Sequence, residues 1–299
     1  MENFILIIVA ISIGYFFQKI KLFPKETPTA LNQFVIYISL PALVLLEIPT
    51  LEFSKETIIP IIMAWTIMTI SAILTFISCK FFKFTKEVTG ALMLVTVLGN
   101  TSFLGIPLIE AYYGKEATAY ILVYDQLGTF IVLATYATFI VSIYSSTEKL
   151  NLKMIGKKVI TFPPLLSLII ALFMMDVTYP KELTNILSIF ASTIIPLVLV
   201  ALGLQLQFTM PKEDIKPFGI SLGIKLIIAP LIAFFIAYIM SWDGLSTKVS
   251  ILEAGMPSMI SAGALASMAG LAPRLSTAIV GYGIIFSFIT SGAFYLYLG

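Results

Sequence analysis

The chain has 299 residues, of which 59% are hydrophobic and only 11% are charged, and its formal net charge is +2. Water-soluble domains carry about 25% charged residues, so this composition excludes a soluble enzyme and indicates a protein that crosses a membrane several times. The sequence has no histidine and a single cysteine, Cys79, which excludes His-ligated metal sites, Ser-His-Asp catalysis and an intrachain disulfide. We therefore expect no metal, no cofactor and no nucleic-acid partner.

Ten apolar segments follow one another along the chain. They span residues 3–18, 30–46, 58–79, 88–111, 117–144, 160–175, 183–204, 218–241, 248–269 and 275–297. Each is about long enough to cross ~30 Å of hydrocarbon as a helix. The first segment lacks a basic leader and a clear cleavage site, so we expect it to be retained. The sequence predicts an all-α membrane protein with ten transmembrane helices and no water-soluble domain.

The loop charges predict an orientation. Most of the 18 Lys and Arg residues follow odd-numbered segments: Lys19, Lys21, Lys25, Lys80, Lys83, Lys86, Lys149, Lys153, Lys157, Lys158, Lys212, Lys216 and Arg274. The other loops hold only Lys55, Lys115, Lys181 and Lys248. Because positive loops stay inside, this asymmetry predicts a multi-pass protein of the cell membrane with both termini outside.

Prolines recur in two corresponding pairs of segments. Pro41 and Pro196 lie in segments 2 and 7, and Pro107 and Pro257 lie in segments 4 and 9, at nearly equal separations. This pattern predicts two five-helix repeats, residues 1–145 and 159–299, joined by a cytoplasmic connector at 146–158. Five helices is an odd number, so the second repeat is expected to be inverted, as in secondary transporters. The alternative is that proline is simply common in membrane helices.

Segments 4 and 9 are expected to be broken. Gly99, Gly105 and Pro107 weaken helix 4, and Gly255 and Pro257 weaken helix 9. Backbone groups freed in a membrane must face protein or a watery cavity, and paired discontinuous helices are typical of a transport site. The alternative is a pair of structural kinks without ligand contact.

Polar residues beside the breaks are the candidate ligands of a substrate. Half-helix N-termini favour anions, which suits a carboxylate. The candidate substrate-binding residues are Asn100, Thr101, Ser102, Gln126, Met256, Pro257 and Ser258.

Four ionisable residues fall inside predicted spans: Glu110, Asp125, Lys225 and Glu253. Charges at membrane depth are costly and therefore indicate function. Asp125, Glu253 and Lys225 are candidates for coupling transport to an ion, and a carboxylate at Glu253 could carry a proton. The alternatives are that Glu110 reaches the interface, that Lys225 extends to it, and that Glu253 faces an outer aqueous vestibule.

Three segments resemble the auxin efflux carrier family. GNTSFLGIPLIEAYYG is similar to its helix 4 signature, through Asn100-Thr101 and Gly105-Ile106-Pro107-Leu108. LNQFVIYISLPALV resembles its helix 2, and Met256-Pro257 looks like its helix 9 motif. The family includes plant auxin exporters and bacterial carriers of malate and malonate. The short connection from Ser145 to Lys158 favours the small carboxylates over indole acids.

The resemblance implies a ten-helix fold like that of bile-acid sodium symporters and sodium/proton antiporters. It implies a scaffold of helices 1, 2, 6 and 7 and a transport domain in which broken helices 4 and 9 cross. It further implies an elevator-like movement and a homodimer.

We interpret the sequence as a secondary active transporter of small organic anions, with no enzymatic activity. No P-loop is present, so direct ATP coupling is not expected. The main alternative is a sodium-coupled symporter, with Na⁺ held by unwound carbonyls near Asn100 and Met256. An intramembrane enzyme lacks histidine and a paired-Asp motif, and a receptor-like sensor would need a partner protein.

Overall fold

A computed structural model describes residues 2–51, 54–145, 161–175, 177–208 and 212–299 of the chain. The regular elements in these ranges are helices, which confirms the all-α prediction. Six helical stretches are long and apolar enough to cross a membrane: Thr27–Thr50, Lys55–Phe81, Lys115–Tyr144, Lys181–Gln205, Ile215–Met240 and Pro273–Leu298. Two shorter apolar helices, Phe4–Ile20 and Pro163–Phe173, coincide with predicted segments 1 and 6.

Predicted segments 4 and 9 are each divided into two short helices, so neither is among the long spans. The count of ten spans and the inverted repeat of residues 1–145 and 159–299 stay predictions. The predicted connector at 146–158 lies outside the described residues.

The chain forms two compact units. The first is drawn from residues 1–54, 102–122 and 156–206, and the second from residues 55–101, 123–155 and 207–299. Segments 1, 2, 6 and 7 fall in the first unit, and segments 3, 8, 9 and 10 fall in the second. Segments 4 and 5 are shared between the units, since residues 102–122 group with the first.

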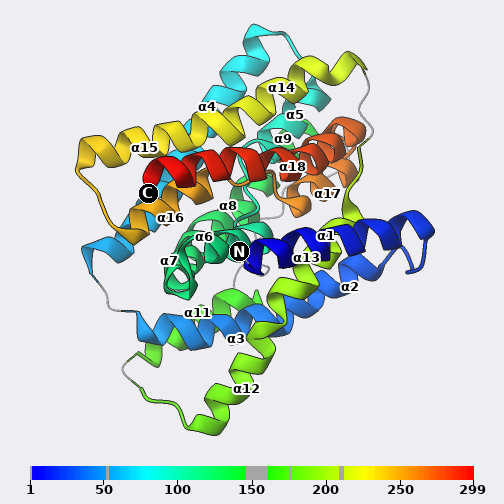
Figure 1. Ribbon diagram of the computed structural model, residues 1–299. Helices are drawn as coiled ribbons and strands as arrows, with labels where there is room; N and C mark the ends of the chain where they lie inside the picture. The colour runs from blue at the N-terminus through cyan, green and yellow to red at the C-terminus, as the bar shows by residue number, and fades with distance from the viewer. Residues whose placement is uncertain (1, 52–53, 146–160, 176, 209–211) are drawn as a thin grey trace. The chain divides into compact units, whose positions relative to one another are not determined.

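The first unit is built on a close pair of helices, α1 (Glu2–Ile20) and α13 (Ile194–Gln205), which lie side by side in Figure 1. Gly14 and Gly203 face each other there, and a methyl group on either would overlap a backbone oxygen of the other helix. Small residues are what allow membrane helices to approach this closely. The unit also contains α2 (Thr27–Phe34), α3 (Leu40–Glu47), α6 (Ile106–Tyr113), most of α7 (Thr118–Tyr124), α11 (Pro163–Phe173) and α12 (Lys181–Ser192).

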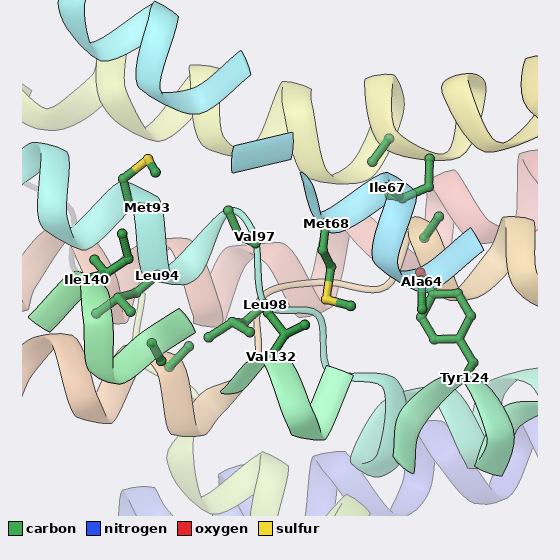
Figure 2. Packing of buried hydrophobic residues seen from close by; sticks show 14 of the residues in the cluster. Ala64, Ile67, Met68, Met93, Leu94, Val97, Leu98, Tyr124, Val132 and Ile140 are labelled. Carbon is green, nitrogen blue, oxygen red and sulfur yellow. The ribbon is translucent and has the colours of Figure 1, made fainter. Parts of the chain in front are cut away.

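The second unit surrounds a large apolar core. Its helices are α4 (Lys55–Phe81), α5 (Lys86–Val95), α8 (Phe130–Val132), α9 (Thr138–Tyr144), α14 (Ile215–Gly223), α15 (Ala229–Met240), α16 (Leu245–Ala254), α17 (Ile260–Met268) and α18 (Pro273–Leu298). Figure 2 shows part of the core, where Leu98 lies close to Val132 and Ala64 lies beside Tyr124. Leu98 belongs to a non-helical segment, so this core holds an interrupted helix in place.

Proline explains several π-helical turns. Pro41, Pro107 and Pro230 are each the second residue of an α-helix, and a π-helical turn comes directly before each helix: η1 (Val35–Ser39), η3 (Thr101–Gly105) and η8 (Ile224–Ile228). Proline lacks an amide proton and clashes with the carbonyl four residues earlier. The wider π turn accommodates that clash without ending the helix.

Apolar side chains also cover outward faces. Along η8 and α15, Ile227, Leu231, Phe235 and Tyr238 are all at least half exposed. They recur at helical spacing and form a stripe that water would solvate poorly. The outward stripe and the long apolar helices together indicate a multi-pass membrane protein.

Candidate functional site

The two interrupted helices meet at their breaks. α5 ends at Val95 and α16 ends at Ala254, and each is followed by a short non-helical segment. The amide of Asn100 donates to the carbonyl of Pro257 at 2.7 Å, and the amide of Met259 donates to the carbonyl of Leu98 at 2.9 Å. Gly99 and Ser258 lie opposite each other in this antiparallel bridge. The bridge satisfies backbone groups that would otherwise be unpaired at membrane depth.

Of the residues predicted to break helices, some lie in non-helical segments and others lie in helical turns. Gly99, Gly255 and Pro257 lie in the non-helical segments. Gly105 and Pro107 lie in helical turns, at the end of η3 and the start of α6. Proline is tolerated there because the wider π turn before it accommodates the clash of its ring with the preceding turn. At Asn100 the helix is interrupted, and the amide of this residue donates to the carbonyl of Pro257 in place of a helical partner.

A buried polar chain begins beside the bridge at Thr101. Its hydroxyl donates to Asp125 Oδ1 at 2.5 Å, and Gln126 Nε2 donates to Asp125 Oδ2 at 2.7 Å. Asp125 and Gln126 open a π-helical turn, η5 (Asp125–Thr129), and are 2% and 0% exposed. Both oxygens of the Asp125 carboxylate thus accept a hydrogen bond, as a buried charge requires.

Lys225 and Glu253 lie at the same place. Lys225 is buried within η8, and its Nζ donates to the carbonyl of Ala254 at 3.3 Å. A methyl group placed on Gly99 would lie 2.8 Å from the same Nζ, so the ammonium adjoins both breaks. Glu253 is fully buried and interacts electrostatically with Lys225 and Asp125.

The free hydrogen-bonding capacity of the cluster is unevenly distributed. Within the described part of the chain, Ser258 Oγ, Gln126 Oε1 and both carboxylate oxygens of Glu253 are buried without a hydrogen-bond partner. The hydroxyl proton of Thr101 already points to Asp125. Ser258 is therefore better placed than Thr101 to donate to a ligand, and Asp125 serves to position Thr101 and Gln126.

The remaining predicted ligands are placed differently. Met256 is fully buried in the non-helical segment beside Pro257, and Asn100 is 2% exposed within the bridge. Ser102 follows Thr101 in η3 and is half-buried. Glu110 belongs to the first unit, where it accepts a hydrogen bond from Thr118 Oγ1 at 2.6 Å. Local bonding therefore accounts for Glu110.

Two polar contacts that support α5 have no sequence signature. The hydroxyl of Tyr136 donates to the carbonyl of Met93 at 3.0 Å, near the end of α5. The hydroxyls of Thr96 and Ser221 lie 2.7 Å apart, also at the end of this helix. Helix ends leave four carbonyls without intrahelical partners, and Tyr136 satisfies one of them, whereas the contact between Thr96 and Ser221 joins this helix end to α14. A mid-helix Tyr or Ser has many structural uses, and only tertiary contacts single these out.

A multi-pass helical protein with two interrupted helices joined at a buried, charged cluster has the architecture of a membrane transporter. Comparison with known proteins agrees with this class: the chain belongs to the Membrane transport protein family, the auxin efflux carrier family, which it matches over residues 1–295. The predicted membership of this family is thereby confirmed, and the protein is a transporter and not an enzyme.

Two archaeal relatives are similar along most of their length. An uncharacterized transporter of Methanocaldococcus jannaschii is 30% identical over 277 residues, which cover 86% of this chain and 85% of that protein. An uncharacterized transporter of Methanothermobacter thermautotrophicus is 26% identical over 269 residues, covering 89% of this chain and 87% of that protein.

Proposed function

We propose that this protein is a secondary active transporter of small organic anions, carboxylates among them, in the cell membrane. The observation that carries the proposal is the bridge between Asn100 and Pro257, which joins two interrupted helices within a buried polar cluster. Such breaks at membrane depth are the usual substrate site of secondary transporters.

The substrate carboxylate is placed at the half-helices that begin after the bridge. Helix N-termini present amide donors and a positive dipole end, both of which favour an anion. The α17 N-terminus starts at Ile260, two residues after Ser258, whose buried hydroxyl has no partner among the described residues. Ser258 and Asn100 supply side-chain donors in this proposal, with Gln126, Met256 and Pro257 shaping the site. Thr101 and Ser102 complete it.

Transport would proceed by an elevator-like movement of the unit that holds the crossover. The scaffold role falls to the first unit, in which α1 and α13 pack at Gly14 and Gly203. In the proposal the protein works as a homodimer with both termini outside the cell. The loop lysines and arginines support this orientation through the positive-inside rule.

The test of the proposed function is counterflow in proteoliposomes with malate, malonate and indole acetate, each with and without sodium and a pH gradient. Saturable exchange of a small carboxylate supports the proposal, and exchange of none of the three by folded protein contradicts it. Asn100→Ala is expected to abolish exchange while membrane insertion persists. Unchanged kinetics in this variant would remove Asn100 from the site.

The alternative function is sodium-coupled symport, as in bile-acid carriers. Its support is the fully buried Glu253 carboxylate beside unwound backbone carbonyls, since oxygen ligands suit Na⁺. It predicts that uptake stops when sodium is replaced by choline, whereas the leading proposal predicts continued exchange.

A further inference from the structure

The ammonium of Lys225 occupies an unusual position in the second unit. η8 places this side chain in the protein interior at 3% exposure, ten residues after the start of the apolar stretch Ile215–Met240. Its Nζ donates to the Ala254 carbonyl at 3.3 Å and would lie 2.8 Å from a methyl group on Gly99. The charge is therefore held between the two breaks, and it does not extend to a membrane surface.

The surroundings of this ammonium are rich in oxygen and negative charge. Ala254 is the last residue of α16, so its carbonyl lies at the negative end of the helix dipole. The amides of Gly255 and Met256 donate to the carbonyls of Leu252 and Glu253, which leaves the Ala254 carbonyl for Lys225. α5 directs its own C-terminal end toward the same bridge.

Glu253 provides an independent second observation. Its side chain is 0% exposed, and neither carboxylate oxygen accepts a hydrogen bond from any residue that the structure describes. Asp125 and Lys225 are its charged neighbours, so the buried cluster contains two carboxyl groups and one ammonium. Buried carboxylates need a cation nearby, and the ammonium of Lys225 supplies one from the chain itself.

Backbone carbonyls and a carboxylate are the oxygen ligands by which proteins hold alkali cations. We propose that Lys225 is the built-in cation of the crossover, which takes the place of a free Na⁺ or K⁺, and that removing its side chain creates an alkali-cation site at the Ala254 carbonyl and the Glu253 carboxylate. The wild-type protein consequently neither binds nor requires a free alkali cation at this site.

The experiment measures cation binding in purified, detergent-solubilised protein by ²²Na⁺ equilibrium dialysis and by thermal unfolding in NaCl, KCl or choline chloride. The variants are Lys225→Ala and Lys225→Gln. The matched control is Lys248→Ala, which removes a lysine of α16, the helix that ends at Ala254; the Nζ of Lys248 donates to the carbonyl of Gly299 at 2.7 Å, away from the breaks. Wild type and Lys248→Ala are expected to show the same Tm in all three salts and no saturable ²²Na⁺ binding.

Lys225→Ala or Lys225→Gln is expected to lose several degrees of Tm in choline, to recover them in NaCl or KCl, and to bind ²²Na⁺ saturably. Adding Glu253→Gln to either variant should abolish that binding. Saturable ²²Na⁺ binding by the wild type overturns the proposal. The proposal is also overturned if the Lys225 variants have the same Tm in all three salts and bind no ²²Na⁺ saturably. If neither variant folds, saturable ²²Na⁺ binding by the wild type still overturns the proposal.

The inference rests on the proposed function only in treating the crossover as the transport site. Its readout is cation binding without substrate, so the two proposals fail separately. Absence of carboxylate counterflow would contradict the proposed function and leave the role of Lys225 standing. Sodium binding by the wild type would contradict the proposed role of Lys225 and leave the proposed carboxylate transport standing.

Discussion

Two pairs of helices that contain proline differ in how they accommodate the loss of helical hydrogen bonds. In the first unit, Pro41 and Pro196 leave their helices nearly continuous, and the pair meets through side chains, with the hydroxyls of Ser39 and Thr193 2.7 Å apart. In the second unit, the helices that contain Gly99 and Pro257 unwind and meet through backbone hydrogen bonds. A proline alone therefore does not break a helix. The break needs glycine or asparagine nearby and a second unwound chain that satisfies the freed backbone groups.

The same contrast holds for charge. The contact between Ser39 and Thr193 uses two neutral hydroxyls, whereas Asp125, Lys225 and Glu253 gather at the crossover. Burying a charge destabilises the fold, so buried charges are rare at contacts with a purely structural role and indicate a functional site. The comparison therefore supports a structural role for the first pair and the proposed transport site at the second pair.

The largest effect is expected from Gly203→Ala, in the first unit. The added methyl group would overlap the carbonyl oxygen of Ile11, and a backbone atom cannot rotate away. Overpacking of this kind costs about 3 kcal/mol, so we expect little folded protein. Gly219→Ala is the control, because nothing lies within 4 Å of its added methyl group. Fluorescence-detected size-exclusion chromatography measures both, and equal yields would show that the α1 and α13 contact can open.

Pro257→Ala tests whether the break itself is needed. Alanine restores an amide donor and relaxes the backbone, which favours continuation of α16 through the bridge. We expect exchange to fall roughly tenfold or more, equivalent to about 1.4 kcal/mol, with folding retained. Pro196→Ala is the matched change in the first unit, where the residue lies in the first turn of α13 and little change is expected. Similar losses in both variants would contradict the contrast between the pairs.

Thr101→Val tests the positioning role of Asp125. The variant keeps the shape of the side chain but removes the 2.5 Å hydrogen bond to a buried carboxylate. Removing a hydrogen bond to a buried carboxylate costs about 1–3 kcal/mol, which we expect as a lower Tm and slower exchange. Thr101→Ser keeps the hydroxyl and should behave like the wild type. A normal Tm in Thr101→Val would show that Asp125 has another adequate donor.

The smallest effect is expected from Ser39→Ala. Thr193 Oγ1 still donates to the carbonyl of Phe190 at 2.6 Å, so no buried donor is left without a partner. The cost should be about 1 kcal/mol or less, and exchange should be unaffected. Thermal unfolding and counterflow measure the two quantities. A clear loss of exchange would show that the first unit contributes to transport directly.

Much of the fold was predictable from local patterns. Apolar segments of membrane-spanning length predict helices with little ambiguity, because unpaired backbone groups are not tolerated in lipid. Gly99, Asn100 and Pro257 indicated where helices weaken. Pro107 indicated the same, yet it begins α6 within a helical turn, because a π turn before it absorbs the clash. Sequence patterns rank helix-breaking residues without showing which of them has a partner.

Only the tertiary structure decided which hydrogen-bond and charge partners the buried polar residues have. The sequence by itself determined a helical membrane protein, its family, and four ionisable residues within apolar segments. It left Lys225 with several interpretations, because helical spacing says nothing about residues on other helices. Folding placed its ammonium on the Ala254 carbonyl and beside Gly99, within the same unit as Asp125 and Glu253. A buried charge needs an opposite charge or hydrogen-bond partners, and these come from residues distant in sequence. Its role is therefore set by long-range packing and not by its neighbours in sequence.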